Sequence, residues 1–63
     1  MNVRILVSDK HMGELEKWAN VSSQEEFDAL VEEWSRYPQT KDFSTTVVLN
    51  WVDQDGPKSR QLL

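Results

Sequence analysis

The sequence predicts a small α+β fold, in which an antiparallel sheet of three strands, with room for a fourth, carries one amphipathic helix on one face. Three observations predict it. The chain has 63 residues, which limits it to one domain spanning 1–63, because so short a chain buries only about 60% of its unfolded surface. Two segments are rich in β-branched and aromatic residues, and a segment between them has helical periodicity. The chain has no cysteine, so its stability must come from packing or from a partner.

Residues 2–8 are predicted to form the first strand, because they are rich in β-branched residues and bounded by turn formers. Two structures fit residues 9–21. A strand is favoured by the alternation of Leu15, Lys17, Ala19 and Val21 with polar residues and Trp18, after a turn at 10–13. A helix fits the spacing of Met12, Leu15, Trp18 and Ala19, but Gly13 weakens a helix by about 1 kcal/mol relative to alanine. We therefore favour a hairpin over a helix.

Residues 22–37 are predicted to form the helix. The apolar residues Phe27, Leu30, Val31 and Trp34 recur at the spacing of a half-buried helical stripe. Ser22 and Ser23 each precede a glutamate by three residues, so either serine can be the N-cap of a capping box. At the other end, Pro38 disfavours helical geometry in the residue before it and ends the helix.

Residues 44–52 are predicted to form a strand, followed by a turn at 53–57. Residues 58–63 fit either a short edge strand or a frayed tail, and the sequence does not choose between them. The expected order is therefore β-β-α-β, with a fourth strand if the last segment pairs.

The negative charge is concentrated in one segment. The formal net charge is −4, and residues 20–40 carry all of it, since five acidic residues there face a single base, Arg36. This bias disfavours phosphate binding, so we expect no direct nucleic-acid partner. The first residues contain only three consecutive apolar side chains, too few for a secretory signal or a membrane span. We therefore expect a cytoplasmic protein with no membrane partner.

No pattern indicates an enzyme, a cofactor or a metal site. The only histidine, His11, lies near Ser8 and Asp9, but side chains in one turn rarely converge into a catalytic triad. One histidine and no cysteine leave too few ligands for zinc. We expect His11 to be an exposed loop residue.

Two features can carry function. The first is the acidic helix face of Glu25, Asp28 and Glu32, which lies away from the apolar stripe. Its simplest interpretation is a solvated face that keeps the chain soluble. The sharper interpretation is a steering surface for a basic protein, or a mimic of the phosphate backbone of nucleic acid.

The second feature is the sheet face that the helix cannot cover. Val3, Ile5, Val7, Ala19 and Val21 form a consistent inner set, which leaves Leu6, Trp18 and Val48 on the other side, with Arg4 beside them. Trp and Arg are residue types that often anchor interfaces. This face has three possible covers: the C-terminal tail with Leu62 and Leu63, a second copy of the chain as a homodimer, or another protein.

The function that the sequence favours is a non-enzymatic, acidic protein-interaction module that binds or inhibits another protein. Its size and acidity resemble those of small phage and mobile-element proteins, which is an analogy of composition only. The expected binding residues are Arg4, Leu6, Trp18 and Val48 as the anchor and Glu25, Asp28 and Glu32 as the steering surface. The alternatives are an acidic nucleic-acid mimic that blocks a DNA- or RNA-binding protein, and a non-catalytic subunit of a larger enzyme.

Overall fold

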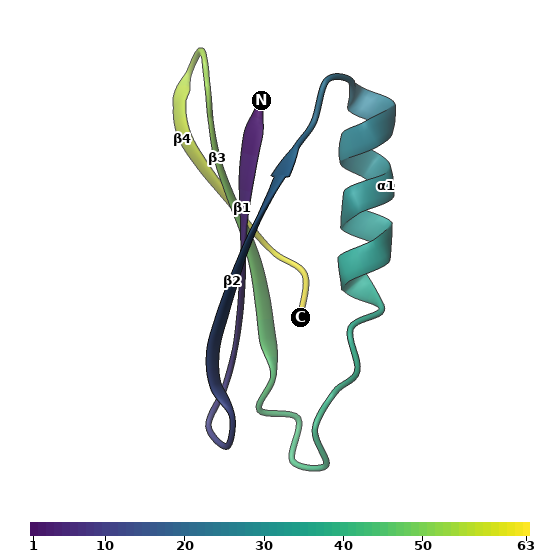
Figure 1. The fold of residues 1–63 in the computed structure, drawn as a ribbon, viewed down its shortest axis with the longest axis vertical. Helices are drawn as coiled ribbons and strands as arrows, with labels where there is room; N and C mark the ends of the chain where they lie inside the picture. The colour runs from purple at the N-terminus through teal and green to yellow at the C-terminus, as the bar shows by residue number, and fades with distance from the viewer.

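The computed structural model describes residues 1–63 and has two layers, a twisted four-stranded antiparallel sheet and one helix against one of its faces (Figure 1). The elements in chain order are β1 (Asn2–Asp9), β2 (Gly13–Asn20), α1 (Gln24–Ser35), β3 (Thr46–Asp53) and β4 (Gly56–Gln61). Within the sheet the order is β2-β1-β3-β4, so β1 and β3 are central and β2 and β4 are edges. The predicted α+β class is confirmed, and residues 56–61 supply the fourth strand.

Both hairpins turn at a glycine with positive φ. In the first, Asp9 pairs with Gly13 (φ +83°), and the Asp9 carboxylate accepts the backbone N–H groups of His11 and Met12 at 2.7 and 2.6 Å. In the second, Asp53 pairs with Gly56 (φ +111°). Glycine adopts positive φ without the steric penalty of a Cβ atom. The predicted hairpin is thus confirmed, and the helical alternative for residues 9–19 is wrong.

The helix α1 is shorter at both ends than the predicted range of 22–37. Its N-cap is Ser23, whose hydroxyl accepts the Glu26 N–H at 3.2 Å, while the Glu26 carboxylate accepts the Ser22 N–H. This arrangement satisfies two backbone donors at the helix start. The helix ends at Ser35, where the N–H groups of the next two residues bond three residues back and tighten the last turn.

The core lies between the sheet and α1. Its buried side chains all come from the helix side of the sheet and the strand end before α1, and are Val3, Ile5, Val7, Val21, Val47 and Leu49. The predicted stripe of α1 packs on them, and Phe27 meets Trp51 edge to face with ring centroids 4.9 Å apart. No residue of α1 is fully buried, so the helix covers the core without being enclosed by it.

The C-terminal tail also packs on the helix side. The Leu62 N–H donates to the Val47 carbonyl at 2.8 Å, and both Leu62 and Leu63 contact the core. In Figure 1 the chain leaves β4 and curls toward α1. The tail therefore does not cover the opposite face of the sheet, here called the outer face. Of the three possible covers named from the sequence, the tail is excluded.

The molecule is more extended than a typical compact protein of its length. Its radius of gyration is 12.2 Å, against about 10.6 Å for a compact chain of this length. Its accessible surface is 4621 Å², against about 4,200 Å² for a typical monomer of this mass. The one helix, with 12 residues, lacks the length and apolar character needed to cross a membrane.

Because the core lies on one side of the sheet, we expect substitutions at two neighbouring residues of β3 to lower the free energy of unfolding by different amounts. Leu49 is 0% exposed at the centre of the core, whereas Val48 lies on the outer face and is half-buried. We expect Leu49→Ala to lower the free energy of unfolding by about 2–5 kcal/mol, a large part of the roughly 3–9 kcal/mol available to a domain of this size. Val48→Ala should cost about 1 kcal/mol or less. Urea titration followed by circular dichroism measures both, and equal losses would contradict a core on one side only.

Candidate functional site

The outer face is an ordered array of side chains from all four strands. Strand pairing aligns two rows across the sheet: the first contains Trp18, Arg4, Asn50 and Ser59, and the second contains Glu16, Leu6, Val48 and Gln61. Arg4, Leu6 and Trp18, predicted to be neighbours, are brought together, and Val48 stands directly opposite Leu6. The sheet register thus assembles the four residues that the sequence assigned to the anchor.

Trp18 is held in place although it is 62% exposed. Its indole N–H donates to the Glu16 carboxylate at 2.9 Å, and the other oxygen of that carboxylate lies 2.8 Å from the Arg4 guanidinium. Arg4 donates a further hydrogen bond from Nε to the same oxygen at 3.0 Å. The hydrogen bond from Trp18 and then that from Arg4 lower the pKa of Glu16 below its ordinary value of 4.5. The ion pair therefore orients the indole without covering it.

A hollow of about 800 Å³ lies on the outer face beside Trp18. Trp18 on edge strand β2 borders one side, and Val52 and Pro57 of the β3–β4 hairpin border the other. The floor between them contains Asn2, Arg4 and Asn50 from the central strands. Apolar side chains thus border the hollow on two sides, Asp53, Lys58 and Ser59 also line the hairpin side, and polar side chains form much of the floor.

The asparagines of the hollow were missed by the sequence analysis. The side chains of Asn2 and Asn50 make no hydrogen bond within the chain, although each amide can donate and accept. Asparagine is depleted in strands, so two of them facing outward from central strands were a detectable signal. These amides leave the floor of the hollow with free donors and acceptors.

The acidic residues Glu25, Asp28 and Glu32 lie on the exposed side of α1, across the sheet from the outer face. Glu32 pairs with Arg36 at 2.6 Å, and Asp28 accepts a hydrogen bond from Gln24 at 3.0 Å. They are therefore separate from the hollow and do not form one site with it.

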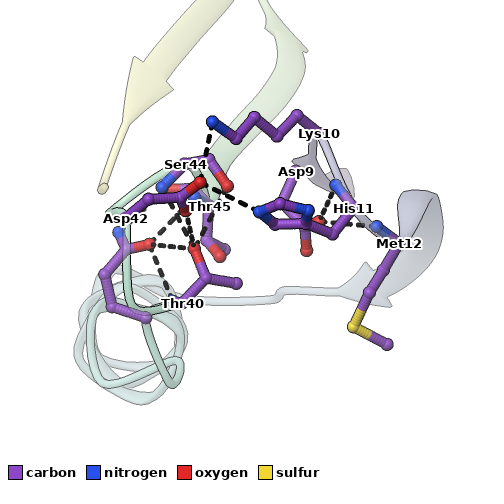
Figure 2. A network of polar contacts seen from close by, with 9 residues as sticks. Asp9, Lys10, His11, Met12, Thr40, Asp42, Ser44 and Thr45 are labelled. Carbon is purple, nitrogen blue, oxygen red and sulfur yellow. Dashed lines mark hydrogen bonds and ion pairs between the residues drawn. The ribbon is translucent and has the colours of Figure 1, made fainter.

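Ser8, Asp9 and His11 do not form a triad. The Ser8 hydroxyl lies 2.8 Å from that of Thr46, and the imidazole of His11 contacts Asp42 at 2.9 Å instead (Figure 2). Asp42 also accepts from Lys10 at 2.8 Å and from Thr40 at 2.9 Å. Hydrogen bonds from Lys10, His11 and Thr40, in that order, hold the pKa of Asp42 far below its usual range.

This network joins the turn between β1 and β2 to the loop between α1 and β3 (Figure 2). All its polar members have partners within the chain, which fits a structural tether. No cluster of three or more His, Asp or Glu side chains offers a metal site.

The chain matches no protein-family model, no curated protein and no solved structure. A functional proposal therefore rests on the outer face and the acidic helix themselves.

The Glu16 contacts predict a pH response of Trp18. Because the pKa of Glu16 is lowered in the folded chain, its stabilising contacts are fully present above pH 4.5 and are lost as the pH falls through the lowered value. We expect the Trp18 indole N–H resonance to shift with a midpoint below pH 4.5. In Arg4→Ala the midpoint should rise toward 4.5. Two-dimensional NMR, with the signal assigned by Trp18→Phe, measures the shift, and a resonance that is insensitive to acid would refute the contact.

Proposed function

We propose that this chain is a non-enzymatic, cytoplasmic interaction module that binds another protein in a defined stoichiometry, with its outer face as the docking surface. One observation carries the proposal: Trp18 is exposed yet fixed by Glu16, on a face that neither α1 nor the C-terminal tail covers. A fixed aromatic side chain loses little conformational entropy on binding. That is the property of a preorganised anchor.

The composition of the face supports a protein partner. Trp and Arg are enriched at interface centres, and here Trp18 and Arg4 are paired residues on adjacent strands. The half-buried Leu6 and Val48 continue the apolar surface along the central strands. The surface in excess of a typical monomer, about 400 Å², is also consistent with a face that is covered in a complex.

The acidic helix acts at longer range in this proposal. The net charge of −4 that residues 20–40 carry lies on the other layer of the molecule, so the helix does not contact a partner that is seated on the outer face. It attracts a partner of basic overall charge during diffusion, and this effect weakens as salt rises. Affinity then depends mainly on the outer face, and the rate of association depends on the helix.

Trp18→Ala tests the docking surface. We expect this variant to fold normally, because the side chain is largely exposed, and to lose at least ten-fold in affinity for its partner. The matched control is Phe43→Ala, which removes an aromatic side chain that is 79% exposed in the loop at the opposite end of the molecule.

The measurement is affinity capture from extract of the source cell with the wild type and both variants, quantified by mass spectrometry, and then calorimetry on the captured protein. The proposal expects a protein that is retained by the wild type and Phe43→Ala and lost with Trp18→Ala. A partner retained equally by all three would show that the outer face is not the docking surface.

A second candidate function is an acidic mimic of nucleic acid. It is favoured by the exposed carboxylates of α1, where only Glu32 has an ion-pair partner among five acidic residues. In this case the triple variant Glu25→Gln, Asp28→Asn, Glu32→Gln should lose most of its affinity, and Trp18→Ala should lose none. Wild-type affinity should also fall steeply between about 50 and about 500 mM salt. Calorimetry on the captured partner separates the two functions, because an apolar anchor tolerates salt.

A further inference from the structure

The hollow on the outer face is shaped for a narrow, convex occupant. One wall lies on edge strand β2 and the other on the β3–β4 hairpin, two to three strand spacings away, which is about 10–14 Å. One wall is the indole of Trp18, and the other is formed by Val52, which is 68% exposed, and Pro57. The gap between these walls has room for a single chain segment with one apolar side chain directed into it.

The C-terminal tail does not fill the hollow, and a second copy related by a two-fold axis through the hollow does not fill it either. The C-terminal tail is bonded to Val47 on the helix side, away from the hollow. A dimer whose two-fold axis passes through the hollow places the hollow of one copy against that of the other. Two concave surfaces would then face each other, and both hollows would stay unfilled.

The unpaired side-chain amides of the floor favour an extended partner segment over a helical one. Asn2 and Asn50 each offer a donor and an acceptor with no partner in the chain. Within a helix, the backbone N–H and C=O groups are already paired internally except at the ends. An extended segment carries free groups along its whole length, and a side-chain amide pairs with a backbone amide in both directions. The floor is therefore complementary to an extended backbone.

Charge also disfavours a nucleic-acid strand here. A base could stack on Trp18, but the Arg4 guanidinium is already paired with Glu16, which leaves Lys58 as the one basic side chain of the lining without an ion pair. Binding of a strand needs a basic track for its phosphates. The outer face does not offer one.

We propose that the hollow binds an extended segment of the partner protein, with the backbone paired to Asn2 and Asn50 and one aliphatic or proline side chain held between Trp18 and the Val52–Pro57 wall. This inference rests on the proposed function and specifies the kind of partner. Affinity comes from the apolar side chain and from the backbone pairs, so the recognised motif is short and needs no helical periodicity.

The first experiment selects ligands from a displayed library of random eight-residue peptides on the immobilised full chain, with Trp18→Ala as the counter-selection. We expect enriched peptides to share one aliphatic or proline residue in an otherwise polar context. Measured by fluorescence polarisation, Trp18→Ala should weaken binding at least ten-fold, and Asn2→Ala and Asn50→Ala about five-fold each. Asn20→Ala is the matched control, because Asn20 lies on the same face outside the hollow, and its affinity should be unchanged.

The second experiment tests the backbone contact directly. Single amide bonds of a selected peptide are replaced by esters, which removes one N–H donor at a time. At the position opposite Asn50 the ester should weaken binding to the wild type about five-fold and should have no further effect on Asn50→Ala. Circular dichroism and thermal unfolding confirm that each variant is folded.

Several results would overturn the inference: no Trp18-dependent peptide, peptides that need helical periodicity, or affinities unaffected by Asn2→Ala and Asn50→Ala. Trp18-dependent binding of a single-stranded oligonucleotide, or a Trp18-dependent dimer or polymer in light scattering, would do the same. The captured partner separates this failure from that of the proposed function. A partner that is lost with Trp18→Ala and retained by both asparagine variants would leave the docking surface standing and remove only the extended-segment inference.

Discussion

The whole structure depends on burial against one face of the sheet. The central strands β1 and β3 direct Val3, Ile5, Val47 and Leu49 to the helix side, and α1 is the only helix available to cover them. The C-terminal leucines and Trp51 are drawn to the same side, because that is where apolar surface can be removed from water. With every covering element on one side, the other face is left to solvent or to a partner.

The outer face meets two opposing requirements. To remain folded alone, the chain needs polar groups there, and asparagine, serine, threonine and glutamine occupy many of its positions. To bind a partner as proposed, it needs apolar groups that are fixed before the partner arrives. The Glu16 carboxylate reconciles these requirements, because it satisfies the polar edge of the Trp18 indole and the Arg4 guanidinium while the ring itself stays exposed. Polar contacts within the face thus hold an exposed apolar ring in place.

Alternation along the strands was sufficient to predict the inner set and to place Leu6 and Trp18 outside, because a strand exposes successive residues on opposite faces. The sequence did not decide the fourth strand, since residues 58–61 are polar and Pro57 removes a ladder donor. Pairing there depends on β3 and not on local propensity. The hollow and the contact from Glu16 to Trp18 arise from sheet twist and from side-chain rotamers, which a sequence pattern does not encode. The tether from Asp42 to His11 joins residues 31 positions apart and was equally invisible.

The edge position of β2 has a consequence for how the chain behaves at high concentration. Paired hydrogen bonds between Met1 and Val21 set the alternation of the β1–β2 ladder, so the backbone groups of Glu14, Glu16 and Trp18 point away from β1 toward open water. Such a row is a template on which further strands can assemble into fibrils. Glu14, Glu16 and Lys17 are exposed along this edge, so an incoming strand would have to remove water from charged side chains, of which Glu16 is already paired with Arg4. Charged side chains on an edge strand are a common means by which proteins oppose such edge-to-edge assembly.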